Sequence, residues 1–144
     1  MPQDFDYDQV TVEVAIESTR LTPEQITQIV GVPCDECRYV GDQRGKTGKT
    51  WDRNIWWLRN RKRTADNPGK SAHDLLPICM AEFFERLSTI REGLRQAVQS
   101  EGGQFGITTT CTFVPGLSFD QKIITEIADL GLSLDIDVIL YGSD

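Results

Sequence analysis

The chain has 144 residues, of which 39% are hydrophobic and 26% are charged, a composition typical of one folded domain rather than of a disordered chain. No apolar run approaches the roughly 20 residues that a transmembrane helix requires, and the acidic start "MPQDFDYDQ" is unlike a secretory signal. We therefore expect one cytoplasmic domain over residues 1–144 that does not bind a membrane, with its four cysteines reduced.

The net charge of −7 is unevenly distributed along the sequence. Residues 38–70 hold ten basic and three acidic residues, a balance of +7, so the rest of the chain carries −14. Such a division predicts a bipolar surface that meets a basic partner on one side and an acidic partner on the other. The alternative is that the basic segment is simply a solvated loop.

The first predicted elements are a strand and a helix. Apolar and polar residues alternate over 10–17, which predicts a strand with one buried face. In the following "LTPEQITQIVGV", Thr22 suits the N-cap, Pro23 the first helical position and Gln25 the third position of a capping box. Gly31 is expected to end this helix.

Two further strands are predicted at 38–40 and 55–59, paired as a hairpin across the basic segment. The stretch "NRKRTADNPGKSA", residues 60–72, has no apolar residue larger than Ala and contains Asn-Pro-Gly. It predicts an exposed and mobile loop.

A long helix is predicted over 74–99, where apolar residues recur every three or four positions. Gly93 or the Ser88-Thr89 pair is expected to break it in two. A strand at 105–113 ends at Pro115-Gly116, and a helix capped by Asp120 follows. The last strand, 132–140, alternates so regularly that Leu134 is expected in the core.

The order of these elements predicts an α+β fold. The first six follow the split-βαβ (ferredoxin-like) order, and a further helix-strand unit completes the chain. We expect an antiparallel sheet of about five strands, with the helices packed on one face and the other face wet.

One stretch, "GDQRGKTGKT" at 41–50, resembles the end of a phosphate-binding loop. A P-loop requires four residues between its first Gly and the Gly-Lys-Ser/Thr, and both ways of counting fail here. A strand also follows instead of a helix. We therefore expect a flexible hairpin connection without nucleotide binding.

For each of the other candidate sites, a structural role explains the residues better than a catalytic or metal-binding role does. Cys34 and Cys37 have metal-ligand or thioredoxin spacing, but no second Cys-x-x-Cys exists and the pair follows a helix rather than opening one. His73 is the only histidine and has no nucleophile at recognisable spacing. Asp135 and Asp137 share one face of a strand, which is ordinary for a wet face. We expect no catalytic residue, no cofactor and no metal.

The stretch "KTWDRNIWWLRNRKR" interleaves three Trp with six basic residues, the composition of a nucleic-acid surface. Trp56 and Trp57 point to opposite faces of a strand, so at most one belongs to the core. The residues predicted to contact a partner are Trp56, Arg59, Arg61, Lys62, Arg63, Asp135 and Asp137.

Taken together, the "LTPEQITQIVGV" helix, the "VGD" that follows, the Trp-containing strand, the long helix and the closing "DLGLSLDIDVIL" resemble the bacterial family called domain of unknown function 4279. The resemblance covers nearly the whole chain and implies a single α+β domain without known catalytic residues. The Cys34/Cys37 pair and the insertion "RGKTGKTWDRN" are not part of the family pattern.

The function expected from these observations is non-enzymatic binding of a protein partner. Its most concrete form is a bacterial immunity-type protein that neutralises a co-encoded toxin domain by contact, since small acidic proteins of this kind often have that role. The alternative is a nucleic-acid binding module that uses the basic, Trp-containing hairpin at 44–63.

Overall fold

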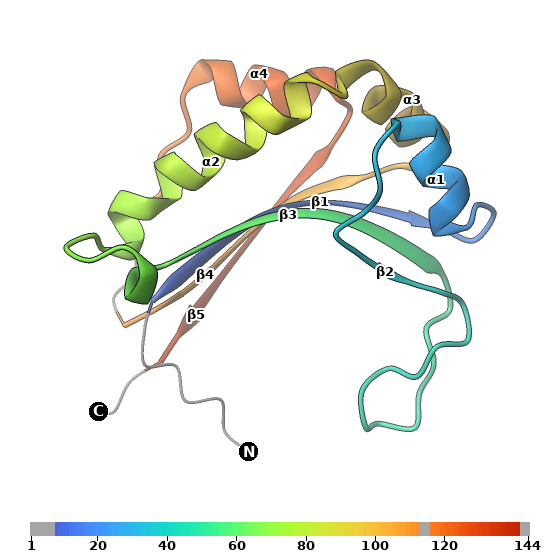
Figure 1. Cartoon of the computed structure of the whole chain (residues 1–144), viewed down its shortest axis with the longest axis horizontal. Coiled ribbons are helices and arrows are strands. Elements are labelled where there is room, and N and C mark those ends of the chain that lie inside the picture. Colours follow the sequence, from blue (N-terminus) through green and yellow to red (C-terminus); the bar gives the residue numbers. More distant parts are fainter. Residues whose placement is uncertain (1–7, 113–115, 142–144) are drawn as a thin grey trace.

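The structure, a computed structural model, describes residues 8–112 and 116–141. It has a five-stranded sheet in the order β2-β3-β1-β4-β5, with helices over one face (Figure 1). The strands are β1 (Gln9–Ser18), β2 (Glu36–Arg38), β3 (Asn54–Arg63), β4 (Gln104–Cys111) and β5 (Ser133–Leu140). The helices are α1 (Pro23–Val30), α2 (Ala72–Ser88), α3 (Arg91–Glu101) and α4 (Gln121–Asp129), with a 3-10 turn at Thr64–Asp66. The predicted strand end at Phe113 and the turn at Pro115 lie outside the described residues.

The predicted α+β class and the split-βαβ order are confirmed. Strand β1 pairs antiparallel with β3 and β4, and β2 pairs antiparallel with β3. The β4–β5 pair is parallel, because α4 carries the chain back across the sheet before β5 begins. The sheet is therefore mixed and mostly antiparallel.

The helix boundaries follow from local chemistry that the sequence already displays. The Thr22 hydroxyl accepts a hydrogen bond from the Gln25 N–H at 3.2 Å, and the Gln25 side chain accepts one from the Thr22 N–H at 2.9 Å. Gly31 ends α1 at φ 99°, a left-handed conformation that glycine adopts without strain. Ser71 caps α2 in the same way as Thr22 caps α1, and Asp120 caps α4 as predicted.

The predicted long helix consists of two helices that meet at residues 89–90. The break thus falls at the Ser88-Thr89 pair, one of the two predicted positions. Gly93 does not break the helix but lies inside α3. A Cβ atom on Gly93 would come within 2.5 Å of the carbonyl oxygens of both Ile29 and Val30, so glycine allows α3 to pack directly on the end of α1.

Two boundaries around the hairpin differ from the prediction. The first strand, predicted at 38–40, lies at Glu36–Arg38, and the second extends to Arg63 instead of ending at 59. Residues 60–63 therefore belong to β3 and not to an exposed loop. They lack large apolar side chains but pair along their whole length with β1, because backbone ladder bonds do not depend on side-chain polarity.

The core lies between the sheet and the helices, and the inward residues of β1 (Val10, Val12, Val14 and Ile16) are completely buried. Strand β5 departs from this pattern. Leu134 is 44% exposed and Ile136 39% exposed, so the prediction that Leu134 is a core residue is wrong. The reason is that β5 is an edge strand, and α4, which packs on it, buries only Ile127.

Within the described ranges, no helix has both the length and the hydrophobicity that crossing a bilayer would require.

Candidate partner-binding surface

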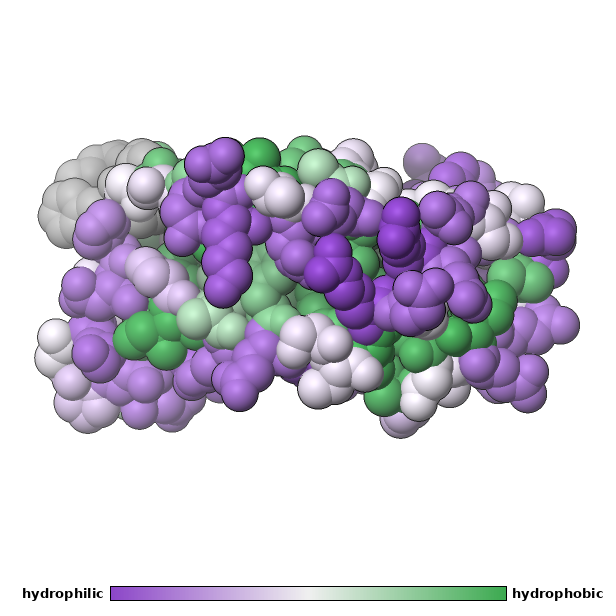
Figure 2. Space-filling view, turned by 90° about the horizontal axis from the view of Figure 1, so that it is seen from above, coloured by the Kyte–Doolittle hydropathy of each residue, from purple (hydrophilic) through white to green (hydrophobic). Residues whose placement is uncertain are grey.

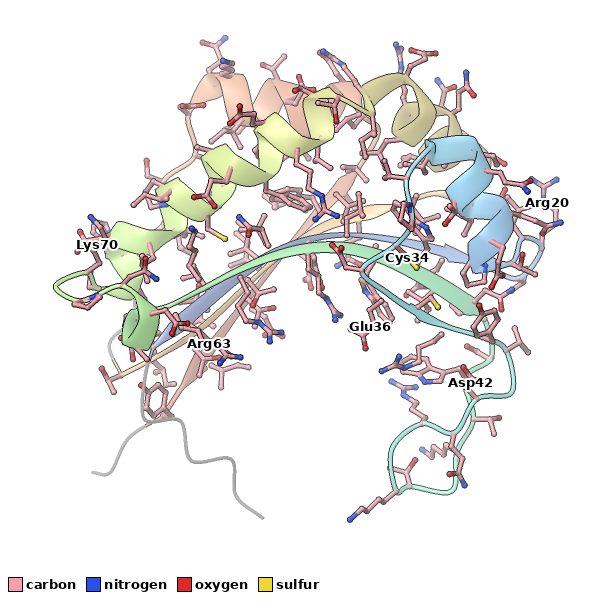
Figure 3. All side chains as sticks on the ribbon, viewed as in Figure 1. Arg20, Cys34, Glu36, Asp42, Arg63 and Lys70 are labelled. Carbon is pink, nitrogen blue, oxygen red and sulfur yellow. The ribbon has the colours of Figure 1, made fainter. Side chains whose placement is uncertain are left out.

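The face of the sheet away from the helices is open, and it gathers five of the seven predicted contact residues. The register places Arg59 opposite Glu13, Glu13 opposite Gly106, and Gly106 opposite Asp135. The next row on the same face runs Arg61, Thr11, Thr108, Asp137. Arg63 lies one row further along β3, and Figure 3 shows it on this side of the sheet. Basic residues thus line one side of the open face and acidic residues the other.

Trp56 and Lys62, the other two predicted residues, point to the helix side. Trp56 is fully buried, and its indole N–H donates a hydrogen bond to the Thr27 hydroxyl of α1 at 3.0 Å. It is a core residue, so it offers no surface to a partner. Lys62 forms an ion pair with Glu82 of α2 at 2.8 Å. The orientations of Trp56 and Lys62 follow from the period of two along a strand, which places even-numbered residues of β3 on the helix side.

Trp57 is the indole that faces outward, and two guanidinium groups stack on it. The Cζ atom of Arg59 lies 4.7 Å from the Trp57 ring centroid, and that of Arg38 lies 5.9 Å away. These are cation–π distances. The sequence indicated that one of the two Trp residues would lie outside the core, and Trp57 is that residue.

Arg59 is also held by carboxylates of neighbouring strands. Its Nε donates to Glu13 Oε2 at 2.6 Å, and its Nη1 pairs with Glu36. Figure 3 shows Glu36 on the open side of the sheet. Glu36 also accepts from Arg38 at 2.6 Å. The Arg59 charge is therefore neutralised from two sides within the chain.

Small residues separate this basic cluster from the acidic strand. A Cβ atom on Gly106 would lie 3.2 Å from Glu13 Cγ, so the missing side chain leaves room for Glu13 to extend toward Arg59. Three strand spacings of about 4.8 Å place β5 about 14 Å from β3, too far for a direct ion pair between Arg59 and Asp135. Among the described residues neither Asp135 nor Asp137 has an ion-pair partner.

The Cys34/Cys37 segment is held by Asp35, one of the two residues between the cysteines. Asp35 accepts two hydrogen bonds from Arg86 of α2, at 2.8 and 3.0 Å, and one from the Arg59 N–H at 2.8 Å. Burial alone would raise the pKa of Asp35, but these hydrogen bonds outweigh it and the pKa lies below its ordinary value. Asp35 thus joins β2 to α2 as a structural anion.

The two thiols are free and partly buried. Burial, with a contribution from Cys37, raises the pKa of the Cys34 thiol, whereas redox-active thiols have lowered values. In the described part of the chain, no group of three His, Cys, Asp or Glu side chains is placed to hold a metal ion.

The stretch at 41–50 forms a hairpin connection, as predicted. The Arg44 N–H donates to the Lys49 carbonyl at 2.8 Å, and Gln43 and Thr50 form a bridge. Gly45 and Gly48 have φ values of 62° and 74°, which the tight turn requires. The connection leads into β3 and extends away from the helices (Figure 1). It does not open a helix, so it lacks the geometry of a phosphate loop.

Sequence analysis missed a cleft of about 820 Å³ between α2, α4 and residues 116–120. Met80, Phe84 and Ile123 contribute its apolar lining. His73 lies at this cleft, where its Nδ1 is 3.2 Å from the Gly116 carbonyl. Figure 2, which looks onto the helices, shows hydrophobic residues between hydrophilic ones along this face. No local signal marks the cleft, because three separate segments form it.

The fold and this surface define an α+β protein with one helix-covered and one open sheet face. The chain belongs to the family described as domain of unknown function (DUF4279), whose model matches residues 8–141. This confirms the resemblance found in the sequence. No curated protein and no solved structure is significantly similar to the chain.

Proposed function

We propose that this protein is a non-enzymatic, cytoplasmic binding protein that neutralises a co-encoded toxin by protein–protein contact, in the manner of bacterial immunity proteins. The observation that carries the proposal is the distribution of unpaired charge. Among the described residues, Arg59 and Lys62 of the basic strand β3 form ion pairs, whereas Asp135 and Asp137 of β5 have no cationic partner at the opposite side of the sheet.

The internal pairing removes basic charge from the surface offered to a partner. Four of the ten basic residues between 38 and 70 form ion pairs with described acidic residues. They are Arg38, Arg53, Arg59 and Lys62. A cation that already contacts a carboxylate gains little from a phosphate, so this pairing argues against a broad nucleic-acid surface.

The acidic side has the opposite character. Residues 116–141 contain five acidic residues and one lysine, a balance of −4. Glu126 and Asp129 share Arg91, at 3.5 and 3.3 Å, whereas Asp135 and Asp137 pair with no described cation. Toxins that act on nucleic acid are often basic, and an acidic surface would steer such a partner and complement its charge.

Co-expression tests this proposal directly. Each gene next to the one that encodes this chain is expressed in a bacterial host, with and without the chain, and growth is measured. We expect one neighbour to stop growth and the chain to restore it, with the two proteins purifying as a stoichiometric complex. An Asp135→Asn/Asp137→Asn variant should rescue less well, and a Glu92→Gln variant, which alters an exposed acid on α3, serves as the control. Absence of any toxic neighbour and of any co-purifying protein would refute the proposal.

A second candidate, nucleic-acid binding, is favoured by one observation at the hairpin tip. Arg44 stacks on Trp51 at 4.6 Å, and Lys46 and Lys49 are exposed beside it. Titration with labelled RNA and DNA at low salt separates the two candidates. Salt-sensitive binding that is lost in an Arg44→Ala/Lys46→Ala/Lys49→Ala variant would favour nucleic acid over a protein partner.

A further inference from the structure

Within the described residues, strand β5 leaves one row of backbone hydrogen-bonding groups without a partner strand. The Ser133 N–H donates to the Gly103 carbonyl at 3.2 Å, and the Tyr141 N–H donates to the Cys111 carbonyl at 3.0 Å. Amide groups of successive residues in a strand point to opposite sides, so odd-numbered residues of β5 face β4. The N–H and C=O groups of Leu134, Ile136, Val138 and Leu140 therefore face away from it.

Apart from its two aspartates, this edge lacks the features with which proteins usually protect an edge strand. Its eight residues, "SLDIDVIL", include no proline, glycine or lysine, and the strand pairs with β4 in unbroken register from Ser133 to Leu140. The opposite edge, β2, is only three residues long. A long and regular edge without proline, glycine or a bulge is a template for an added strand.

The two faces of β5 differ in chemistry, which defines what an added strand would carry. Toward the helices, Leu134 and Ile136 are 44% and 39% exposed. Toward the open face, Asp135 and Asp137 project with no cation of the described chain beside them. A partner strand would match both faces if basic and aliphatic residues alternated along it.

We infer that the free edge of β5 binds an extended segment of a basic protein, which joins the sheet as a sixth strand. Lysine or arginine side chains of that segment lie beside Asp135 and Asp137, and its aliphatic side chains cover Leu134 and Ile136. This inference rests on the proposed protein-binding function and names the surface that carries it.

A second copy of this chain fits the edge less well. Antiparallel pairing of two β5 strands, with their apolar faces on the same side, would bring the Asp135 and Asp137 carboxylates of both copies together on the other side. Like charges on adjacent strands are destabilising, and four carboxylates would meet without a cation among them. Alternating acids thus protect β5 from self-association while favouring a basic strand.

The test uses the whole protein and a synthetic probe. The probe is an end-capped eight-residue peptide in which lysine and valine alternate, and a control peptide has glutamate in place of lysine. Binding is measured by NMR titration, and hydrogen exchange of backbone amides is then compared with and without peptide. At a free peptide concentration of ten times its Kd, we expect exchange of the Leu134, Ile136 and Val138 amides to slow about tenfold. The Glu peptide should leave exchange unchanged.

Two variants separate the backbone contribution from the charge. Ile136→Pro removes an amide that faces away from β4, so the β4–β5 ladder is retained while the edge loses a donor. Binding should be lost in this variant and retained in the matched Ile136→Val variant. The Asp135→Asn/Asp137→Asn variant leaves the backbone of β5 unchanged, so it provides a test even if the proline variant does not fold. It should weaken binding of the Lys peptide about 2- to 30-fold at low salt.

Several outcomes would overturn the inference. Equal binding of both peptides, protection confined to β2 or to the α2–α4 cleft, or undiminished binding by the Asp double variant would each contradict it. Concentration-dependent dimerisation that protects the same amides without peptide would assign the edge to a second copy. If the chain rescues growth but the peptide assays fail, only the assignment of binding to β5 is refuted. If the peptide binds but no neighbouring gene is toxic, only the proposal of a toxin partner is refuted.

Discussion

Gly93→Ala adds a single methyl group, and we expect it to destabilise the fold. In α3 an alanine would ordinarily favour folding by about 1 kcal/mol, because glycine is a poor helix former. Here a Cβ atom would lie 2.5 Å from the carbonyl oxygens of Ile29 and Val30 and 2.9 Å from the Val30 carbonyl carbon. These are backbone atoms at the end of α1, so they cannot rotate away as a side chain would.

The size of the effect follows from the overlap. Contacts of 2.5 Å are well inside van der Waals distance, so α1 must move away from α3 to make room. Val30 and Leu94, which are buried near this contact, would lose packing as the helices separate. Overpacking of this kind costs up to about 3 kcal/mol, and subtracting the gain in helix propensity leaves a net loss of about 2 kcal/mol.

Chemical and thermal denaturation check this value. Gly93→Ala should lower the free energy of unfolding by about 2 kcal/mol and Tm by about 6 to 10 °C, with an unchanged m-value. Gln99→Ala, at an exposed position of the same helix, should change stability by no more than about 0.5 kcal/mol. A Gly93→Ala protein that is as stable as the native chain, or more stable, would refute direct packing of α3 on the end of α1.

Three further predictions concern stability and charge. Leu134→Ala should lower the free energy of unfolding by less than about 1 kcal/mol, because the Leu134 side chain is 44% exposed. Leu58 is fully buried, so Leu58→Ala should lower it by about 2 to 5 kcal/mol. Equal losses of the two variants in urea titrations would contradict the exposed position of β5. Hydrogen bonds from Arg20, Ser100 and Ser18 lower the pKa of Glu101 to about 2. In the unfolded chain the pKa of a glutamate is about 4.3. The stabilising contribution of Glu101 should therefore be complete above about pH 4.3 and should be lost as the pH falls through about 2. NMR titration of the carboxyl group and unfolding of Glu101→Gln over this range check both points. Lys49→Ala should change stability by no more than about 0.5 kcal/mol, and calorimetry should detect no ATP or GTP binding in either protein.

The elements that the sequence predicted best are those decided by nearby residues. Thr22, Gln25 and Gly31 define α1 through contacts within one or two turns of the chain, and each lies where local chemistry requires. The even residues of β1 are buried because a period of two assigns them to one face. The same period separated Trp56 from Trp57, although it could not say which of them was buried.

The errors arose where distant segments decide the outcome. Residues 60–63 form a strand because β1 lies beside them, and no neighbour in sequence indicates that. The alternation of β5 is as regular as that of β1, yet β5 lies at the sheet edge and β1 at its centre. Periodicity identifies the face that a strand would bury, but only the strand order determines whether anything covers it. Arg59 remains a predicted contact residue, but no pattern in the sequence indicates that Glu13 and Glu36 pair with it.

The position of β5 and the pairing of the basic strand together account for the polarity of the molecule. Arg59 and Lys62 of β3 lie among carboxylates of β1, β2 and α2, so part of the basic charge of residues 38–70 is compensated within the fold. Asp135 and Asp137 lie three strand spacings from β3, beyond the reach of those cations. Had β5 been an inner strand beside β3, its acids would lie next to Arg59 and Arg61, and both of its backbone edges would be paired. The strand order therefore both exposes the backbone of β5 and keeps its charge available, which are the two properties that binding a basic strand requires.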